Sequence, residues 1–268
     1  MKSGALSRAR WAQPAVRRSL ALGGITATYL PDGYVELHPA RWFSLDGATS
    51  LYDDRPELIA SSGHLIASIG VLLLEGPGWR ILVDAGLGPT SVPADATHPA
   101  LGVMRGGGLA SFASVIGEVD AVVLTHAHDD HVGWARRGWA GLPGVAGAPH
   151  LVGRDEPAPG DWERVDDGQE IAPGVTAIAT PGHTAGHLSL VVEGDERRLV
   201  VVGDTFHSPL QVEVPHLCSC FDVDPARSRD SRARMLRELE PPGTVAAATH
   251  FADVPFGRVR AGRWEPVA

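Results

Sequence analysis

The sequence predicts an α/β layered sandwich, on the basis of three features. Short runs rich in Val, Ile and Leu end at turn residues, as buried strands do. Helical patterns are fewer and lie between these runs, and no linker or shift in composition divides the chain. Strands and helices that alternate in one undivided chain favour layers around a common core. The predicted strands are Ser68 to Leu74, Arg80 to Val83, Ala121 to Leu124, Val175 to Ala179, Leu188 to Val192, Leu199 to Val202 and Val245 to Ala248.

An earlier strand is expected from Ile25 to Leu30, where apolar residues alternate. The sequence Pro31-Asp32-Gly33 predicts a turn that ends this strand. Residues 1–18, which include Arg17-Arg18, are expected to form a solvated N-terminal arm, and residues 19–268 a single domain. The apolar run after the arm is too short for an export signal, so we expect no cleaved leader.

The clearest helix is predicted to begin at Asp224-Pro225, because an aspartate N-cap followed by proline is typical of a first turn. It extends to Leu239 and ends before Pro241-Pro242-Gly243. Two further helices are expected, one from Leu109 to Ile116 and one starting just after His131. Gly88 to Gly108 is expected to be a mobile loop over the functional site, and Gly138 to Pro149 a surface loop.

The composition excludes several classes of protein. The 268 residues are 44% hydrophobic and 21% charged, which is typical of globular proteins and not of disordered ones. The net charge of −9 counts against a nucleic-acid partner, because the phosphates of nucleic acids need cations. The longest apolar stretch, Leu65 to Leu74, is too short to cross a bilayer. We therefore expect a cytoplasmic protein with no nucleic-acid or membrane partner.

Histidine is unusually frequent, with 12 residues, and its placement predicts a metal site. Directly after the strand ending at Leu124 come His126, His128, Asp130 and His131. Imidazole and carboxylate groups are ligands of Zn²⁺ in proteins. Alternate residues of an extended segment share a face, so His126 and His128 can bind one ion. If a helix begins next, Asp130 and His131 point toward a neighbouring position, and this spacing suits two adjacent metals.

Donor residues also follow three other predicted strands, and these donors are His183, Asp204 and His250. A histidine-rich surface tract that binds nothing would not need donors at other strand ends. The combined pattern therefore predicts a metal centre to which four strand ends contribute.

The string His126-Ala-His128-Asp-Asp130-His131, followed by His183, Asp204 and His250, resembles the metallo-β-lactamase superfamily of dinuclear metallohydrolases. The resemblance extends from Ile25 to about Arg260 and implies a four-layer αββα sandwich with the metals at one edge of the paired sheets. It implies that the first metal is held by His126, His128 and His183. It implies that the second is held by Asp130, His131 and His250, and that Asp204 bridges both. Asp84 matches the strand-end aspartate that supports the ligands in this superfamily.

Within the superfamily, Asp130 and Asp204 distinguish this chain from the β-lactamases with a cysteine ligand. The pattern resembles the lactonase, glyoxalase II, ribonuclease Z and methyl parathion hydrolase branches, and it is most similar to the methyl parathion hydrolase and lactonase-like branch. The acidic charge balance disfavours ribonuclease Z. Homoserine-lactone hydrolases place a tyrosine near the loop of the bridging aspartate, whereas the tyrosines here are Tyr29, Tyr34 and Tyr52.

The resemblance implies a hydrolase with two divalent ions, for which zinc is expected and Mn, Co and Fe are accepted by the same ligands. A hydroxide that bridges the metals would attack an ester, lactone, thioester or phosphotriester bond of a small molecule, with Asp130 orienting it. Metal-bound water, His207 or Asp129 would protonate the leaving group. The alternatives are an iron-dependent redox enzyme similar to a persulfide dioxygenase and a non-catalytic scaffold. The sequence also allows the protein to form a homodimer.

Several other residues have two interpretations. His187 is expected to hydrogen-bond near the site and not to bind metal. His207 and His216 belong either to a pocket wall or to a surface loop. Cys218 and Cys220 are expected to be reduced, inert thiols. Bulky apolar residues form either a substrate wall or ordinary core, and these are Trp42, Phe43, Met104, Phe112, Trp134 and Phe206.

Overall fold

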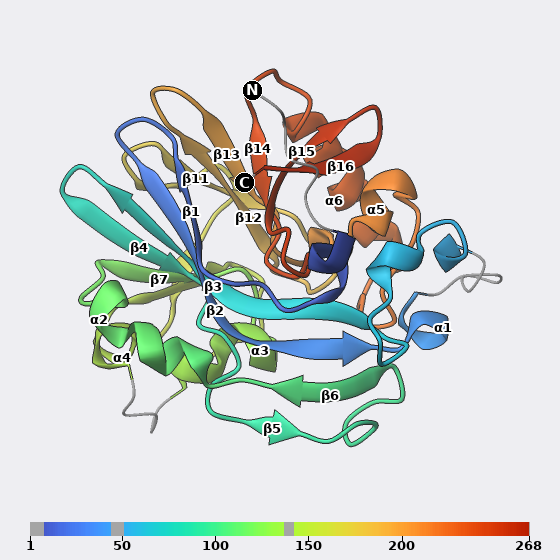
Figure 1. Cartoon of the computed structure of the whole chain (residues 1–268). Coiled ribbons are helices and arrows are strands. Elements are labelled where there is room, and N and C mark those ends of the chain that lie inside the picture. The colour runs from blue at the N-terminus through green and yellow to red at the C-terminus, as the bar shows by residue number, and fades with distance from the viewer. Residues whose placement is uncertain (1–7, 44–50, 137–141, 268) are drawn as a thin grey trace.

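The computed structural model describes residues 8–43, 51–136 and 142–267. Two β-sheets pack face to face, and helices lie against the outer face of each sheet (Figure 1). The predicted four-layer αββα sandwich is therefore confirmed.

Over the described residues the first sheet has nine strands, which mix parallel and antiparallel pairs. They are β1 (Arg18–Ala21), β2 (Thr26–Leu37), β3 (Leu65–Gly76), β4 (Trp79–Val83), β5 (Ser91–Val92), β6 (Leu101–Arg105), β7 (Ala121–Leu124), β8 (His150–Gly153) and β9 (Glu163–Val165). Their order is β5-β6-β2-β3-β4-β7-β8-β9, and β1 pairs with β2. The pairs from β4 through β7 and β8 to β9 are parallel, and the others are antiparallel.

The second sheet has seven strands within the same described ranges, and their order in space follows the chain. They are β10 (Glu170–Ala172), β11 (Val175–Ala179), β12 (Leu188–Glu193), β13 (Arg198–Val201), β14 (Val245–Ala247), β15 (Phe256–Arg260) and β16 (Arg263–Pro266). The pair β13 and β14 is parallel, and the other neighbours are antiparallel.

Helices form the two outer layers (Figure 1). The first sheet is covered by α2 (Ala113–Ile116), α3 (Asp129–Val132) and α4 (Pro143–Gly147), and the second by α6 (Pro225–Glu238). Two further short helices are α1 (Pro39–Trp42) and α5 (Leu210–Glu213). The carboxylate of Asp224 accepts hydrogen bonds from the N–H groups of Ala226 and Arg227, as the predicted N-cap requires. Among the described residues, no helix is long and apolar enough to cross a membrane.

The apolar run of β3 is continuous because both of its faces are buried. Leu72 and Leu74 point into the core between the two sheets, whereas Val71 and Leu73 pack against the outer helices. A strand covered on both sides needs apolar residues at every position. This packing explains why the sequence shows a run here and no alternation.

The predicted turn at Pro31-Asp32-Gly33 is wrong, because β2 continues through it with an irregularity in its pairing to β3. The buried carboxylate of Asp32 accepts hydrogen bonds from four backbone N–H groups and the indole N–H of Trp134. Gly33 leaves room for the neighbouring strand, since a Cβ there would lie 1.7 Å from the Arg105 carbonyl oxygen. The turn-like residues therefore mark a bulge that anchors adjacent loops.

Two loop predictions also need correction. Gly88 to Gly108 is not a free loop, because it contains β5 and β6, which extend the first sheet beside β2. Gly138 to Pro149 contains α4, and its beginning lies outside the described residues.

The helix expected just after His131 begins earlier, at Asp129, because His128 is its extended N-cap. The helix predicted from Leu109 to Ile116 is present as a 3₁₀ turn, Gly108–Phe112, followed directly by α2.

The arm predicted at the N-terminus is partly packed onto the second sheet. Arg17 is exposed, but Arg18 pairs with the buried carboxylate of Asp253 at 2.6 Å, and Arg10 pairs with it at 3.0 Å. The expectation of a solvated Arg18 is therefore wrong. Asp253 lies three residues after His250, so the N-terminal segment holds the loop of a predicted metal ligand.

Candidate metal centre

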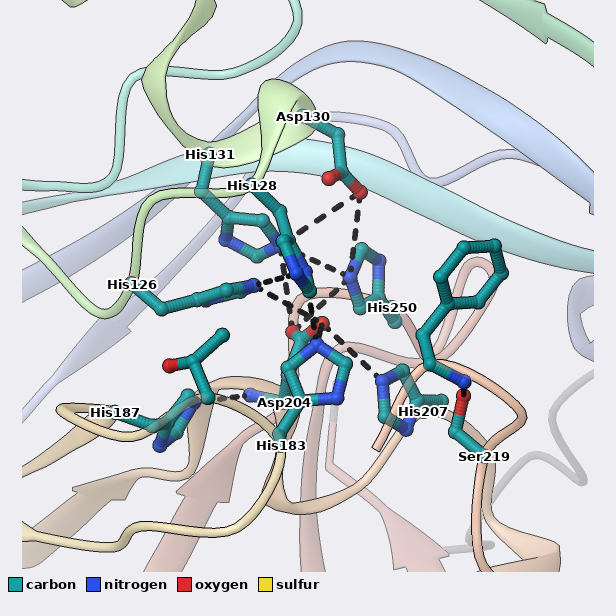
Figure 2. Close-up of polar contacts among 12 residues, drawn as sticks. His126, His128, Asp130, His131, His183, His187, Asp204, His207, Ser219 and His250 are labelled. Carbon is teal, nitrogen blue, oxygen red and sulfur yellow. Dashed lines mark hydrogen bonds and ion pairs between the residues drawn. The ribbon is translucent and has the colours of Figure 1, made fainter. Parts of the chain in front are cut away.

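Strand direction brings the predicted ligands to one edge of the sandwich. β4 and β7 are parallel, so the loops with Asp84 and His126 leave the first sheet together. β13 and β14 are parallel in the second sheet, so the loops with Asp204 and His250 also leave together. Figure 2 shows that the side chains of His126, Asp204 and His250 converge on one small volume.

The first donor group consists of His126, His128, His183 and Asp204. His128 Nδ1 lies 2.9 Å from His126 Nε2 and 3.0 Å from His183 Nε2. Oδ2 of Asp204 lies 3.3 Å from His183 Nε2 and 3.7 Å from His126 Nε2. Three imidazole nitrogens and one carboxylate oxygen this close together can surround a single cation.

The second donor group consists of Asp130, His131 and His250. Nε2 of His131 lies 3.2 Å from Nε2 of His250. Oδ2 of Asp130 lies 3.6 Å and 3.7 Å from these two nitrogens. All seven candidate ligands therefore lie together, and the histidines and Asp130 divide between the two groups as the family resemblance implies.

Asp204 lies between the groups, and its two oxygens face different ones. Oδ2 faces the first group, while Oδ1 lies 3.4 Å from His131 Nε2 and 3.1 Å from His250 Nε2. Oδ1 is buried, and within the described residues it has no aligned hydrogen-bond partner despite these distances. A buried carboxylate oxygen without a hydrogen bond, beside two imidazole nitrogens, fits a shared cation. The residues present therefore fit two metal ions with a bridging carboxylate.

The charges in this centre are strongly coupled. Burial raises the pKa of Asp204, but His250 and His131 outweigh it and hold that pKa well below its ordinary value. Burial and then His183 lower the pKa of His128 to about 4. Burial also lowers the pKa of His183, yet its hydrogen bonds to Asp204 and Asp222 raise it to about 9. The centre thus holds an ionised Asp204 and a neutral His128, whereas a metal ion at the first group would displace the proton that the neighbouring carboxylates favour on His183.

The outer nitrogen of each of three ligand histidines bonds to an oxygen acceptor. His131 Nδ1 lies 2.9 Å from Asp84, His183 Nδ1 lies 2.9 Å from Asp222, and His250 Nδ1 donates to the Ser68 carbonyl at 2.8 Å. Such partners orient a ligand and make it more basic. The predicted support by Asp84 agrees with this geometry. Asp222 and Ser68 were not predicted, because nothing in their local sequence marks them as partners of a distant histidine.

Two further buried residues hold the ligand loops. The Glu156 carboxylate accepts from Ala127 N–H at 2.9 Å and from Gly186 N–H at 3.0 Å, and thereby ties together two loops that carry ligands. The Asp204 N–H donates to Nε2 of His187 at 2.9 Å. His187 therefore hydrogen-bonds beside the centre, as expected, and does not join either donor group. This role of Glu156 was not predicted, because a single glutamate in a loop forms no sequence pattern that indicates it.

A cavity of about 270 Å³ opens over the two donor groups. His207 lines it, and its Nε2 lies 3.2 Å from Oδ2 of Asp204 without the alignment of a hydrogen bond. Trp42 and Met104 also line it, together with Leu101 and Phe221, which the sequence did not single out.

The other residues with two interpretations do not line this cavity. The buried Phe43, Trp134 and Phe206 belong to the core, Phe112 packs against it, and His216 is exposed. Cys218 and Cys220 are free thiols away from the donor groups. Asp129, by contrast, lines the cavity at its rim, where it pairs with Arg136.

The fold and the two donor groups define an αββα protein with a His/Asp metal centre. The model of the metallo-beta-lactamase superfamily matches residues 69–250, and the chain belongs to this superfamily. The resemblance seen in the sequence is thereby confirmed.

Curated relatives match part of the chain. It is 36% identical over 171 residues to human metallo-beta-lactamase domain-containing protein 1, which covers 61% of this chain and 56% of that protein. It is 34% identical over 168 residues to a hydroxyacylglutathione hydrolase of Synechococcus sp., with 59% and 57% coverage. The chain spans about half the length of the curated relatives it matches.

Solved structures match nearly the whole chain. The hydrolase AbOPH of the beta lactamase superfamily has a TM-score of 0.76 at 22% identity, with coverage of 96% and 99%. The dizinc quorum-quenching lactonase AidC has a TM-score of 0.75 at 18% identity, with coverage of 97% and 99%. At these identities the structures support the fold.

Proposed function

We propose that this protein is a dinuclear, zinc-dependent hydrolase that cleaves an ester, lactone, thioester or phosphotriester bond in a small molecule. The observation that supports the proposal best is the carboxylate of Asp204, whose oxygens face separate donor groups at the floor of a cavity. Bound at these groups, two divalent ions supply a water-derived nucleophile at neutral pH and polarise the bond to be cleaved. Relatives named hydrolases agree with this reaction class.

In this proposal the protein's own residues position the reactants and move a proton. Asp130 binds the second metal and orients the nucleophile, because its carboxylate borders both the second donor group and the cavity. His207 protonates the leaving group, since its buried ring faces the cavity and neither ring nitrogen has an aligned partner among the described residues. A ring nitrogen in that position is available to substrate.

The proposal is tested with metal-quantified protein and a panel of lactones, aryl esters, thioesters and phosphotriesters. We expect two zinc ions per chain and hydrolysis of at least one class, abolished by a chelator and restored by zinc. Inactivity on every class with two zincs bound would overturn the proposal. Bound iron with oxygen consumption would support the redox alternative instead.

The role of His207 has a separate test. The variants His207→Ala and His207→Gln are compared on substrates with good and poor leaving groups. A proton donor predicts a larger loss of kcat on the poor leaving group, by about tenfold to a hundredfold. Equal losses on both substrates would show that His207 is not the proton donor. That result would not contradict the proposal of a metal-dependent hydrolase.

A further inference from the structure

The cavity over the metal centre has an apolar wall. Strands β2 and β6 contribute side chains from the first sheet, and two aromatic residues complete the wall from other segments. The residues are Val35, Leu37, Leu101, Met104, Trp42 and Phe221. A surface of this kind binds apolar groups by excluding water from them.

The apolar wall carries no charge, and the carboxylates of the cavity lie at its floor and rim. Among its described lining residues the carboxylates are Asp129, Asp130 and Asp204, and none is an arginine or a lysine. Arg41 is next to Trp42 in the chain, but its guanidinium donates to the Pro99 carbonyl at 3.0 Å. A carboxylate placed against the wall would therefore lose hydration without a Lys or Arg among the described lining residues to pair with, since Arg136 at the rim pairs with Asp129.

The aromatic part of the wall is linked to the proposed proton donor. The ring of Phe221 lies 5.5 Å from that of Trp42 and 4.7 Å from that of His98. The ring of Trp42 in turn lies 5.4 Å from that of His207. These contacts fix the position of the apolar wall relative to His207, so an apolar group against the wall sets which bond lies over the metals.

From these features we infer that the substrate is an uncharged ester or lactone with a compact apolar group, and that a glutathione thioester is excluded. The inference rests on the proposed hydrolase function and narrows it. The cavity of about 270 Å³ lies just below the roughly 300–1,000 Å³ of pockets for drug-sized ligands, which suits a small acyl or aryl group. We assign the selection of this apolar group to Trp42 and Phe221. Hydroxyacylglutathione, which the Synechococcus relative is named for, carries carboxylates that this wall cannot neutralise.

The first experiment uses two matched pairs of substrates on the zinc-loaded full chain. In para-nitrophenyl butanoate and para-nitrophenyl hemisuccinate, a terminal methyl group is exchanged for a carboxylate. The second pair joins the same hydroxyacyl group to neutral N-acetylcysteamine or to glutathione. We expect kcat/KM to be about a hundredfold lower for the anionic member of each pair, because its charge finds no partner. Equal rates, or faster cleavage of the anionic member, would overturn the inference while leaving a working hydrolase.

A second experiment changes the charge of the wall. Met104→Lys adds a cation to a half-buried wall position, and Met104→Gln is the uncharged control of similar length. We expect the lysine variant alone to shift selectivity toward the hemisuccinate by about tenfold. An unchanged ratio in a folded variant with full metal content would contradict the proposed position of the substrate. Failure of every substrate with two zincs bound would overturn the hydrolase proposal itself.

A third experiment tests the aromatic residues. Trp42→Ala and Phe221→Ala are expected to lower kcat/KM for the butanoate ester more than for the acetate ester, with two zincs still bound. Val223→Ala is the control, because that side chain is 73% exposed and lies two residues from Phe221. Equal losses on both esters would show that these residues act on stability and not on selection.

Discussion

The floor and the wall of the cavity are built in opposite ways. The floor consists of polar residues such as His128 and Asp204, each in a segment that follows a strand, and each bonded or paired to other polar groups. The wall consists of apolar residues such as Leu101 and Phe221, which come from a sheet edge and from distant segments. The floor therefore determines which type of reaction can occur, whereas the wall determines which substrate binds.

The largest effect is expected at the floor, from Asp204→Ala. Loss of the shared carboxylate removes a ligand from both donor groups, so we expect fewer than two zincs per chain. We also expect kcat/KM to fall by at least about a thousandfold, because metal stabilisation of the transition state is worth several kcal/mol. Metal analysis and steady-state kinetics measure this. His216→Ala is the control, since that histidine is exposed and outside the cavity. Two bound zincs and full activity in Asp204→Ala would show that the floor does not need the shared carboxylate to bind metal or to support the reaction.

A smaller effect is expected one layer behind the floor, from Asp222→Asn. The amide keeps the size of the side chain but loses the charge that holds Nδ1 of His183 at 2.9 Å. We expect zinc affinity to weaken by about tenfold to a hundredfold, as for other residues that orient a metal ligand. Competition with a chelator measures the affinity. If affinity is unchanged but the thermal midpoint falls, Asp222 supports the fold and not the metal.

A change of stability without a change of chemistry is expected from Asp253→Asn. This buried carboxylate pairs with Arg10 and Arg18 and lies outside the cavity. Loss of its charge should lower the free energy of unfolding by about 1–3 kcal/mol. Denaturant unfolding of the zinc-loaded protein measures this change, with Arg17→Ala as a control at an exposed position. A loss of zinc at unchanged stability would instead place Asp253 in the support of His250.

The smallest effect is expected at Cys220, next to the wall residue Phe221. Burial raises the pKa of its thiol to about 11. An acid with a raised pKa stays protonated below that value, so little reactive thiolate exists at pH 7 and alkylation should speed up as the pH rises toward 11. Mass spectrometry after timed alkylation measures this. Cys220→Ser should leave kcat/KM and zinc content unchanged. Rapid alkylation at pH 7 would contradict the half-buried setting of this thiol.

The sequence predicted the floor because its information is local. Each ligand follows an apolar run, and parallel pairing of β4 with β7 and of β13 with β14 brings the strand ends together. The N-cap at Asp224 was predictable for the same reason, since a cap acts within one turn.

The wall and the supporting residues depend on contacts between distant segments. The Gly88 to Gly108 segment has the composition of a loop, and its strands form only because β2 offers an edge to pair with. Asp222 lies 39 residues from His183, and no spacing rule links them. Asp32 occupies a turn-like sequence, but tertiary hydrogen bonds to its carboxylate favour a bulge. Such residues gain their roles from the fold and not from their neighbours.

The most direct test is a crystal structure of the zinc-loaded protein, with anomalous diffraction measured at the zinc edge. We predict two anomalous peaks about 3.5–4 Å apart, one on each side of the Asp204 carboxylate. One peak should be bound by His126, His128 and His183, and the other by Asp130, His131 and His250. A single peak, or two peaks not shared by Asp204, would contradict the dinuclear centre.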